Sequence, residues 1–89
     1  MAALITLFQF KLGSNNGVGR SRLRQIWTVA SNSERTQVAR EPRHVGTGHT
    51  YSLLGPSDLG NLSAVEIRLR ILLDKHVEGA TATLLRMNG

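Results

Sequence analysis

The stretch GSNNGVGRS, residues 13–21, decides the fold, because it joins an apolar run to a basic segment. In the run before it, LITLFQFKL (residues 4–12), large apolar side chains alternate with Gln9 and Lys11. Alternation with a period of two, ended by a glycine, predicts a strand. The fold then depends on whether residues 13–21 lead into a second strand or into a helix.

A strand followed by a glycine-rich loop and a basic segment is also how many proteins bind phosphate. A phosphate loop requires G-x-x-x-x-G-K-[ST], in which backbone N–H groups surround the phosphate and the lysine reaches beyond it. Here five residues separate Gly13 from Gly19, and Arg20 stands where the lysine is required. The extra residue breaks the register of the N–H groups, and arginine does not replace a compact ammonium group. Because the NNG at residues 15–17 tolerates positive φ, we interpret the stretch as a hairpin turn.

The segment after the turn, residues 20–30, fits two structures. Leu23, Ile26, Trp27 and Ala30 share one helix face, whereas Leu23, Trp27 and Val29 share one strand face. The succession IWTV favours a strand by intrinsic propensity. We therefore predict that residues 4–30 form a β-hairpin.

Hydrophobic periodicity and breaker residues predict two short strands and one helix in the rest of the chain. Glycine and proline interrupt residues 31–60, with strands expected at RTQVAR (35–40) and HTYSLL (49–54). For residues 63–78, a Ser63/Glu66 capping box, Glu66–Arg70 and Arg70–Asp74 ion pairs and Gly79 beyond the end favour a helix. Its apolar stripe comprises Leu62, Val65, Leu69, Leu72, Leu73 and Val77.

A competing interpretation pairs VEIRLRI (residues 65–71) with ATATLLRM as a second hairpin, because the apolar residues of VEIRLRI alternate strictly. The predicted fold class is α+β, a small, mostly antiparallel sheet with one C-terminal helix, with all-β as the alternative. The 89 residues suit one small domain spanning residues 1–89.

Composition narrows the class of protein. The chain has no cysteine, so neither disulfides nor thiolate-bound zinc stabilise it, and small chains without such links often gain stability from self-association. A homo-oligomer is therefore expected.

The formal charge is +5, and arginine dominates the basic residues, with Lys11 and Lys75 the two lysines. Guanidinium groups suit phosphates and carboxylates.

Three arginines in the predicted hairpin give the first functional hypothesis. On a strand, Arg20, Arg22 and Arg24 lie on one face, and such a row follows a phosphate backbone. Arg68 is a candidate to extend it. We therefore expect a non-enzymatic protein that binds RNA or single-stranded nucleic acid through an arginine-lined sheet face. The alternative is a solvated edge strand whose charge prevents aggregation, and the scarcity of aromatic residues counts against base stacking.

Neither a metal site nor a catalytic set is predicted, and no cofactor is expected. His44 and His49 flank a GTG turn, but no spaced Cys, Asp or Glu accompanies them, and His76 is the one further imidazole. No serine lies in a nucleophile-elbow context, and no pair of carboxylates for acid–base chemistry is identifiable. The sequence therefore predicts that the protein is not an enzyme.

The second functional hypothesis is a small accessory or adaptor protein of a viral type. It would act by forming oligomers and by binding a host protein or an anionic membrane. In the predicted helix, Ile67 and Ile71 lie away from the apolar stripe and would contact the partner. An intracellular, cytoplasmic location is expected. Mitochondrial targeting is the alternative, because the first acidic residue, Glu34, comes late and arginines precede it.

Overall fold

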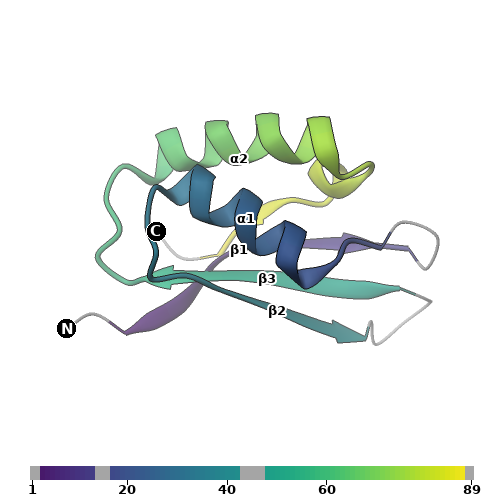
Figure 1. Ribbon diagram of the computed structural model, residues 1–89, viewed down its shortest axis with the longest axis horizontal. Coiled ribbons are helices and arrows are strands. Elements are labelled where there is room, and N and C mark those ends of the chain that lie inside the picture. The colour runs from purple at the N-terminus through teal and green to yellow at the C-terminus, as the bar shows by residue number, and fades with distance from the viewer. Residues whose placement is uncertain (1–2, 14–16, 43–47, 88–89) are drawn as a thin grey trace.

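Five major elements and a short final strand form the described part of the chain, which comprises residues 3–13, 17–42 and 48–87 of a computed structural model. In chain order these are β1 (Leu4–Leu12), α1 (Arg20–Ser31), β2 (Gln37–Pro42), β3 (His49–Pro56), α2 (Leu62–His76) and, after a 3-10 turn (Ala80–Ala82), β4 (Leu85–Arg86). The strands form one layer, and both helices lie on the same side of it (Figure 1). The core lies between these layers.

The sheet has the order β2-β3-β1-β4, and every pair of neighbouring strands is antiparallel. Two βαβ units are thereby interleaved, β1-α1-β2 and β3-α2-β4, which is the split βαβ arrangement of ferredoxin-like folds. The α+β prediction is confirmed. The prediction of one helix is wrong, because the described residues form two α-helices, and the all-β alternative is excluded.

The predicted hairpin over residues 4–30 is wrong, because residues 20–31 form helix α1. Of the two patterns in this segment, the helical one is buried: Leu23, Ile26, Trp27 and Ala30 are at most 7% exposed, whereas Val29 is 64% exposed. Tertiary packing of that stripe outweighs the strand propensity of IWTV. The glycine-rich stretch therefore joins a strand to a helix instead of closing a hairpin. Its residues 14–16 lie outside the described part.

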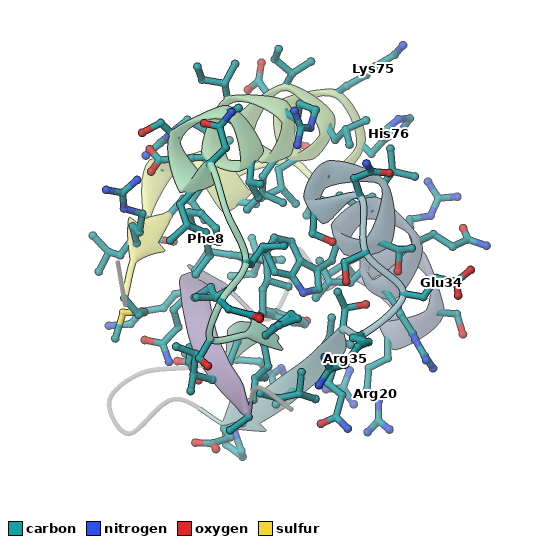
Figure 2. All side chains as sticks on the ribbon, turned by 90° about the vertical axis from the view of Figure 1, so that its left-hand side faces the viewer. Phe8, Arg20, Glu34, Arg35, Lys75 and His76 are labelled. Atoms are coloured by element: carbon teal, nitrogen blue, oxygen red, sulfur yellow. The ribbon has the colours of Figure 1, made fainter. Side chains whose placement is uncertain are left out.

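Trp27 fixes α1 on the sheet. Its indole Nε1 donates a 2.8 Å hydrogen bond to the carbonyl of Leu54 in β3. Its ring meets Phe8 of β1 edge-on, with centroids 5.7 Å apart. Figure 2 shows Phe8 pointing into the interior between the sheet and the helices. One side chain thus connects α1 to both central strands.

Strand β1 is predicted correctly and carries an irregularity that enlarges its buried face. Its register against β3 shifts between Thr6 and Phe8. Leu7 and Phe8 are both buried, although neighbouring residues in a regular strand point to opposite faces. Further along, Phe10 stacks on Tyr51 of β3 with centroids 5.1 Å apart.

Helix α2 confirms the predicted helix, with one correction at its start. Of the predicted stripe, Val65, Leu69, Leu73 and Val77 are at most 5% exposed, and Leu62 and Leu72 are partly buried against the core. The N-cap is Asn61 rather than Ser63: Asn61 has φ 53°, and its side chain accepts a 3.4 Å hydrogen bond from the N–H of Ala64. Asparagine adopts this left-handed conformation more readily than serine, which is consistent with Asn61 rather than Ser63 as the N-cap.

The C-terminal segment closes the sheet beside β1. Leu85 and Arg86 pair with Gln9 and Phe8, so ATATLLRM does not pair with residues 65–71. Before this short strand, the Thr83 hydroxyl accepts a 2.7 Å hydrogen bond from the N–H of Lys11 and lies 3.0 Å from its carbonyl oxygen. A side chain thus takes the place of a strand partner at Lys11.

Candidate nucleic-acid interface

Helix α1 separates the three arginines that a strand would have aligned. Successive residues of a helix are rotated by about 100°, so Arg20 and Arg24 share one flank of α1 while Arg22 lies on the other. All three are exposed. The predicted row of arginines on a sheet face is therefore wrong in its geometry, because these residues lie on a helix.

Arg20 and Arg24 instead line a groove between α1 and the edge strand β2. The groove has a volume of about 660 Å³. Its third arginine, Arg35, comes from the turn between α1 and β2. Figure 2 shows Arg20 and Arg35 projecting on the same side of the molecule, beyond α1 and towards β2. The lining residues are Leu4, Arg20, Ser21, Arg24, Glu34, Arg35, Thr36, Gln37 and Val38.

The groove is held in shape by contacts of the turn with α1 and with itself. Thr36 is 3% exposed, and its hydroxyl lies 3.3 Å from the hydroxyl of Thr28 in α1. The backbone N–H of Arg35 donates a 3.2 Å hydrogen bond to the hydroxyl of Ser33. These contacts place Arg35 opposite the flank of α1 that carries the other two arginines.

The electrostatic character of the groove is basic. Among the described residues that line it, Glu34 is the single carboxylate against three guanidinium groups. Arg40 of β2 lies outside this lining, but it is on the same side of the sheet as the helices, because it lies opposite Tyr51. The charge of this groove therefore complements a polyanion better than a cation.

The sheet face away from the helices offers no base-stacking platform. All four aromatic residues are buried: Trp27 and Phe8 are 0% exposed, and Phe10 and Tyr51 are 1% exposed. The contacts of their rings and polar atoms place them on the helix side of the sheet. On the opposite face, Gln9 donates a hydrogen bond to Ser52.

Arg22 and Arg68 lie apart from the α1–β2 groove. Arg22 lines the depression between the two helices, together with Ile26, Val29, Leu72 and other residues. Arg68 of α2 donates a 3.0 Å hydrogen bond through Nε to the carbonyl of Ala30, in the last turn of α1. Carbonyls at a helix C-terminus lack partners within the helix, so Arg68 joins the two helices structurally.

The predicted partner residues Ile67 and Ile71 are exposed, each to 61%. Their spacing places them on the side of α2 away from the buried stripe, as the helical pattern indicates. Their binding of a partner stays a prediction.

The histidines do not converge in the described structure. His49 lies at the start of β3 and His76 at the end of α2, and His44 lies outside the described residues. Over residues 3–13, 17–42 and 48–87, no group of three His, Asp or Glu side chains is placed to hold a metal ion. In the same ranges, no helix has the length and apolar character needed to cross a bilayer.

Arg35 is the basic groove residue that the sequence interpretation missed. Its significance depends on α1 being a helix, because only then do the turn after α1 and β2 lie beside the flank that carries Arg20 and Arg24. The helical spacing of Leu23, Ile26, Trp27 and Ala30 was the sequence signal for this arrangement.

No known protein family, curated protein or solved structure matches this chain significantly.

Proposed function

We propose that the protein binds RNA or single-stranded nucleic acid without catalysing a reaction, and that the α1–β2 groove holds the phosphate backbone. The observation that carries the proposal is the gathering of Arg20, Arg24 and Arg35 along one groove of about 660 Å³ with a single lining carboxylate among the described residues. Guanidinium forks bind phosphate oxygens through two parallel hydrogen bonds.

The location of the groove favours an extended backbone over base recognition. Arg20, Arg24 and Arg35 come from the start of α1 and from the turn after it, so they are distributed along the helix instead of surrounding one point. With every aromatic ring buried, stacking contributes little to affinity, and the proposed binding depends on charge. We therefore expect little preference among base sequences.

Salt dependence measures the number of phosphates contacted. Each phosphate neutralised on a single strand contributes about −0.7 to the slope of log K against log salt. Three contacts give a slope of about −2, which corresponds to a roughly twentyfold loss of affinity between about 50 and 200 mM salt. Fluorescence anisotropy with a labelled single-stranded RNA at these concentrations provides the measurement.

The decisive comparison is between two triple variants that lose the same charge. R20Q/R24Q/R35Q removes the groove arginines, and R70Q/K75Q/R86Q removes three basic residues from α2 and β4. All six side chains belong to exposed residues, so both variants should fold, which circular dichroism checks. The first variant is expected to lose most of the affinity and most of the salt slope, whereas the second keeps the slope of the parent protein.

Two results would overturn the proposal. If the parent protein fails to bind at the lower salt concentration, the groove does not bind nucleic acid. If the two variants weaken binding equally, the interaction reflects net charge alone and has no site in the groove.

A further inference from the structure

The arginines of this protein differ in whether the fold already engages their side chains. Arg70 and Arg86 lie 3.1 and 4.0 Å from the carboxylate of Glu66. Arg68 bonds to the end of α1, as described above. By contrast, the arginines of α1 and β2 form neither an ion pair nor a side-chain hydrogen bond with any other described residue; these are Arg20, Arg22, Arg24 and Arg40. Their guanidinium groups are therefore available to an anion from outside.

Arg40 stands at one end of the α1–β2 groove. Val38 lines the groove, and Arg40 follows it on the same face of β2, about 7 Å further along the strand. Arg40 lies opposite Tyr51, whose hydroxyl accepts a 3.4 Å hydrogen bond from the N–H of Val18, just before α1. Arg40 is therefore close to the end of the groove at which α1 begins, and this end carries Arg20.

The acidic residues near β2 are directed away from Arg40. Glu41, the next residue of β2, points to the opposite face of the sheet, where it lies across from Thr50. Glu34, the carboxylate that lines the groove, belongs to the turn after α1. Figure 1 shows α1 and β2 running in opposite directions, so this turn lies at the other end of the groove.

The distance between the two ends sets the length of a ligand that contacts both. From Arg35 in the turn to Arg40, the chain advances by five residues, which cover about 16 Å when extended. In a stacked geometry, one nucleic-acid strand carries a phosphate about every 3.4 Å, so roughly five phosphate spacings cover this distance. Because β2 is the edge strand of the described sheet, no neighbouring strand there obstructs the path.

We propose that Arg40 extends the nucleic-acid site beyond the α1–β2 groove, so that the full site is occupied by a single strand of about five nucleotides or more. This inference rests on the proposed function. Arg40 becomes a phosphate contact in addition to Arg20, Arg24 and Arg35. The affinity then depends on the length of the oligonucleotide up to about five nucleotides, whereas its base sequence matters little.

A single substitution with a matched control tests the role of Arg40 in the full chain. R40Q removes the proposed contact. R22Q removes an arginine that is also exposed and without a described partner, but that lies on the other flank of α1. Fluorescence anisotropy with labelled octauridylate, U8, should show that R40Q lowers the affinity about fivefold at about 0.1 M salt, and that it reduces the salt slope from about −2.8 to about −2. R22Q should lower the affinity less than about twofold and keep the slope of the parent protein.

The length of the oligonucleotide tests whether Arg40 extends the site. The trinucleotide U3 without terminal phosphates carries too few phosphates to span the groove and Arg40 together. As a competitor of labelled U8, it should bind R40Q and the parent protein within about twofold of each other. R40K keeps the positive charge and should bind U8 nearly as well as the parent, which separates the charge of Arg40 from a structural role. Circular dichroism checks that all variants are folded.

The outcomes separate this inference from the proposed function. If the parent protein does not bind U8, both are overturned. If R20Q/R24Q/R35Q loses binding but R40Q weakens it no more than R22Q does, the proposed function stands and the site ends within the groove. Equal losses of affinity for U3 and U8 in R40Q would overturn the extended site, because Arg40 would then act without regard to length.

Discussion

The two helices of this molecule are stabilised in different ways. Helix α2 has local supports: the Asn61 cap, a 3.1 Å ion pair between Arg70 and Glu66, and Lys75 and His76 in its last turn, where basic residues favour the helix dipole. Within α1, by contrast, the N-cap Gly19 makes no side-chain hydrogen bond, and neither an acidic first turn nor a basic last turn is present.

Helix α1 therefore depends on its contacts with the rest of the fold. Its first turns carry arginines, which interact unfavourably with the positive end of the helix dipole. What stabilises it is the burial of Leu23, Ile26, Trp27 and Ala30 against the sheet and α2. The comparison teaches that a helix with few local supports, here the left-handed C-cap Asn32, can carry a candidate binding surface, provided that a large buried side chain fixes it in place.

The largest effect should come from Trp27→Ala. Loss of a fully buried tryptophan costs about 3–5 kcal/mol, and a small domain has about 5–15 kcal/mol in total. The hydrogen bond to Leu54 and the contact with Phe8 are lost as well. Urea denaturation followed by circular dichroism should show a greatly lowered midpoint.

Val29→Ala is the control for that substitution, because it shortens a 64%-exposed side chain of the same helix. It should change the free energy of unfolding by less than about 0.5 kcal/mol. Equal destabilisation by the two substitutions would show that α1 does not bury the face described above.

A smaller effect is expected for Arg68→Met, which tests how α2 supports α1. The hydrogen bond from Arg68 to the carbonyl of Ala30 is lost, at a cost of about 1 kcal/mol for a partly buried contact. If Arg68 were instead part of the nucleic-acid interface, the substitution would lower RNA affinity more than Arg70→Met does while leaving stability unchanged. Paired denaturation and RNA titration experiments distinguish the two roles.

The smallest effect should come from a conservative change at the N-cap of α2, Asn61→Gly, for which Asn61→Ala is the comparison. Asn61→Ala removes the cap and places a residue with a Cβ at φ 53°, so it should cost about 1–2 kcal/mol. Asn61→Gly loses only the side-chain hydrogen bond and should cost a few tenths of a kcal/mol. Thermal unfolding of the two variants measures the difference, and equal melting temperatures would contradict the left-handed cap.

This contrast also explains how much the sequence predicts. Helix α2 is predicted from a local pattern that includes the Glu66–Arg70 pair. Strand β1 is predicted from the alternation of apolar and polar residues before Gly13. The helical state of α1 is not predicted in this way, because IWTV prefers a strand. Tertiary packing of Leu23, Ile26, Trp27 and Ala30 reverses that preference, with Trp27 contacting both β1 and β3.

The same reversal limits prediction of the candidate site. Arg20 and Arg24 are identified by composition and spacing, but on the wrong kind of element. Arg35 joins them through the turn after α1, a long-range consequence of the βαβ connection. Arg22 and Arg68 lie elsewhere for the same reason, since the helix distributes residues that a strand would align.

The hydrogen bonds between the Thr83 hydroxyl and the backbone of Lys11 have a consequence for aggregation. Among the described residues, the outer edge of β1 pairs with the two residues of β4, and the Met87 N–H donates to the Leu7 carbonyl. An uncovered strand edge is a template for pairing with another molecule. By engaging both backbone groups of Lys11, the Thr83 hydroxyl removes two hydrogen-bonding groups from that template. One methyl-for-hydroxyl exchange, Thr83→Val, would expose them again and make fibril growth from this edge easier, without altering the charge of the protein.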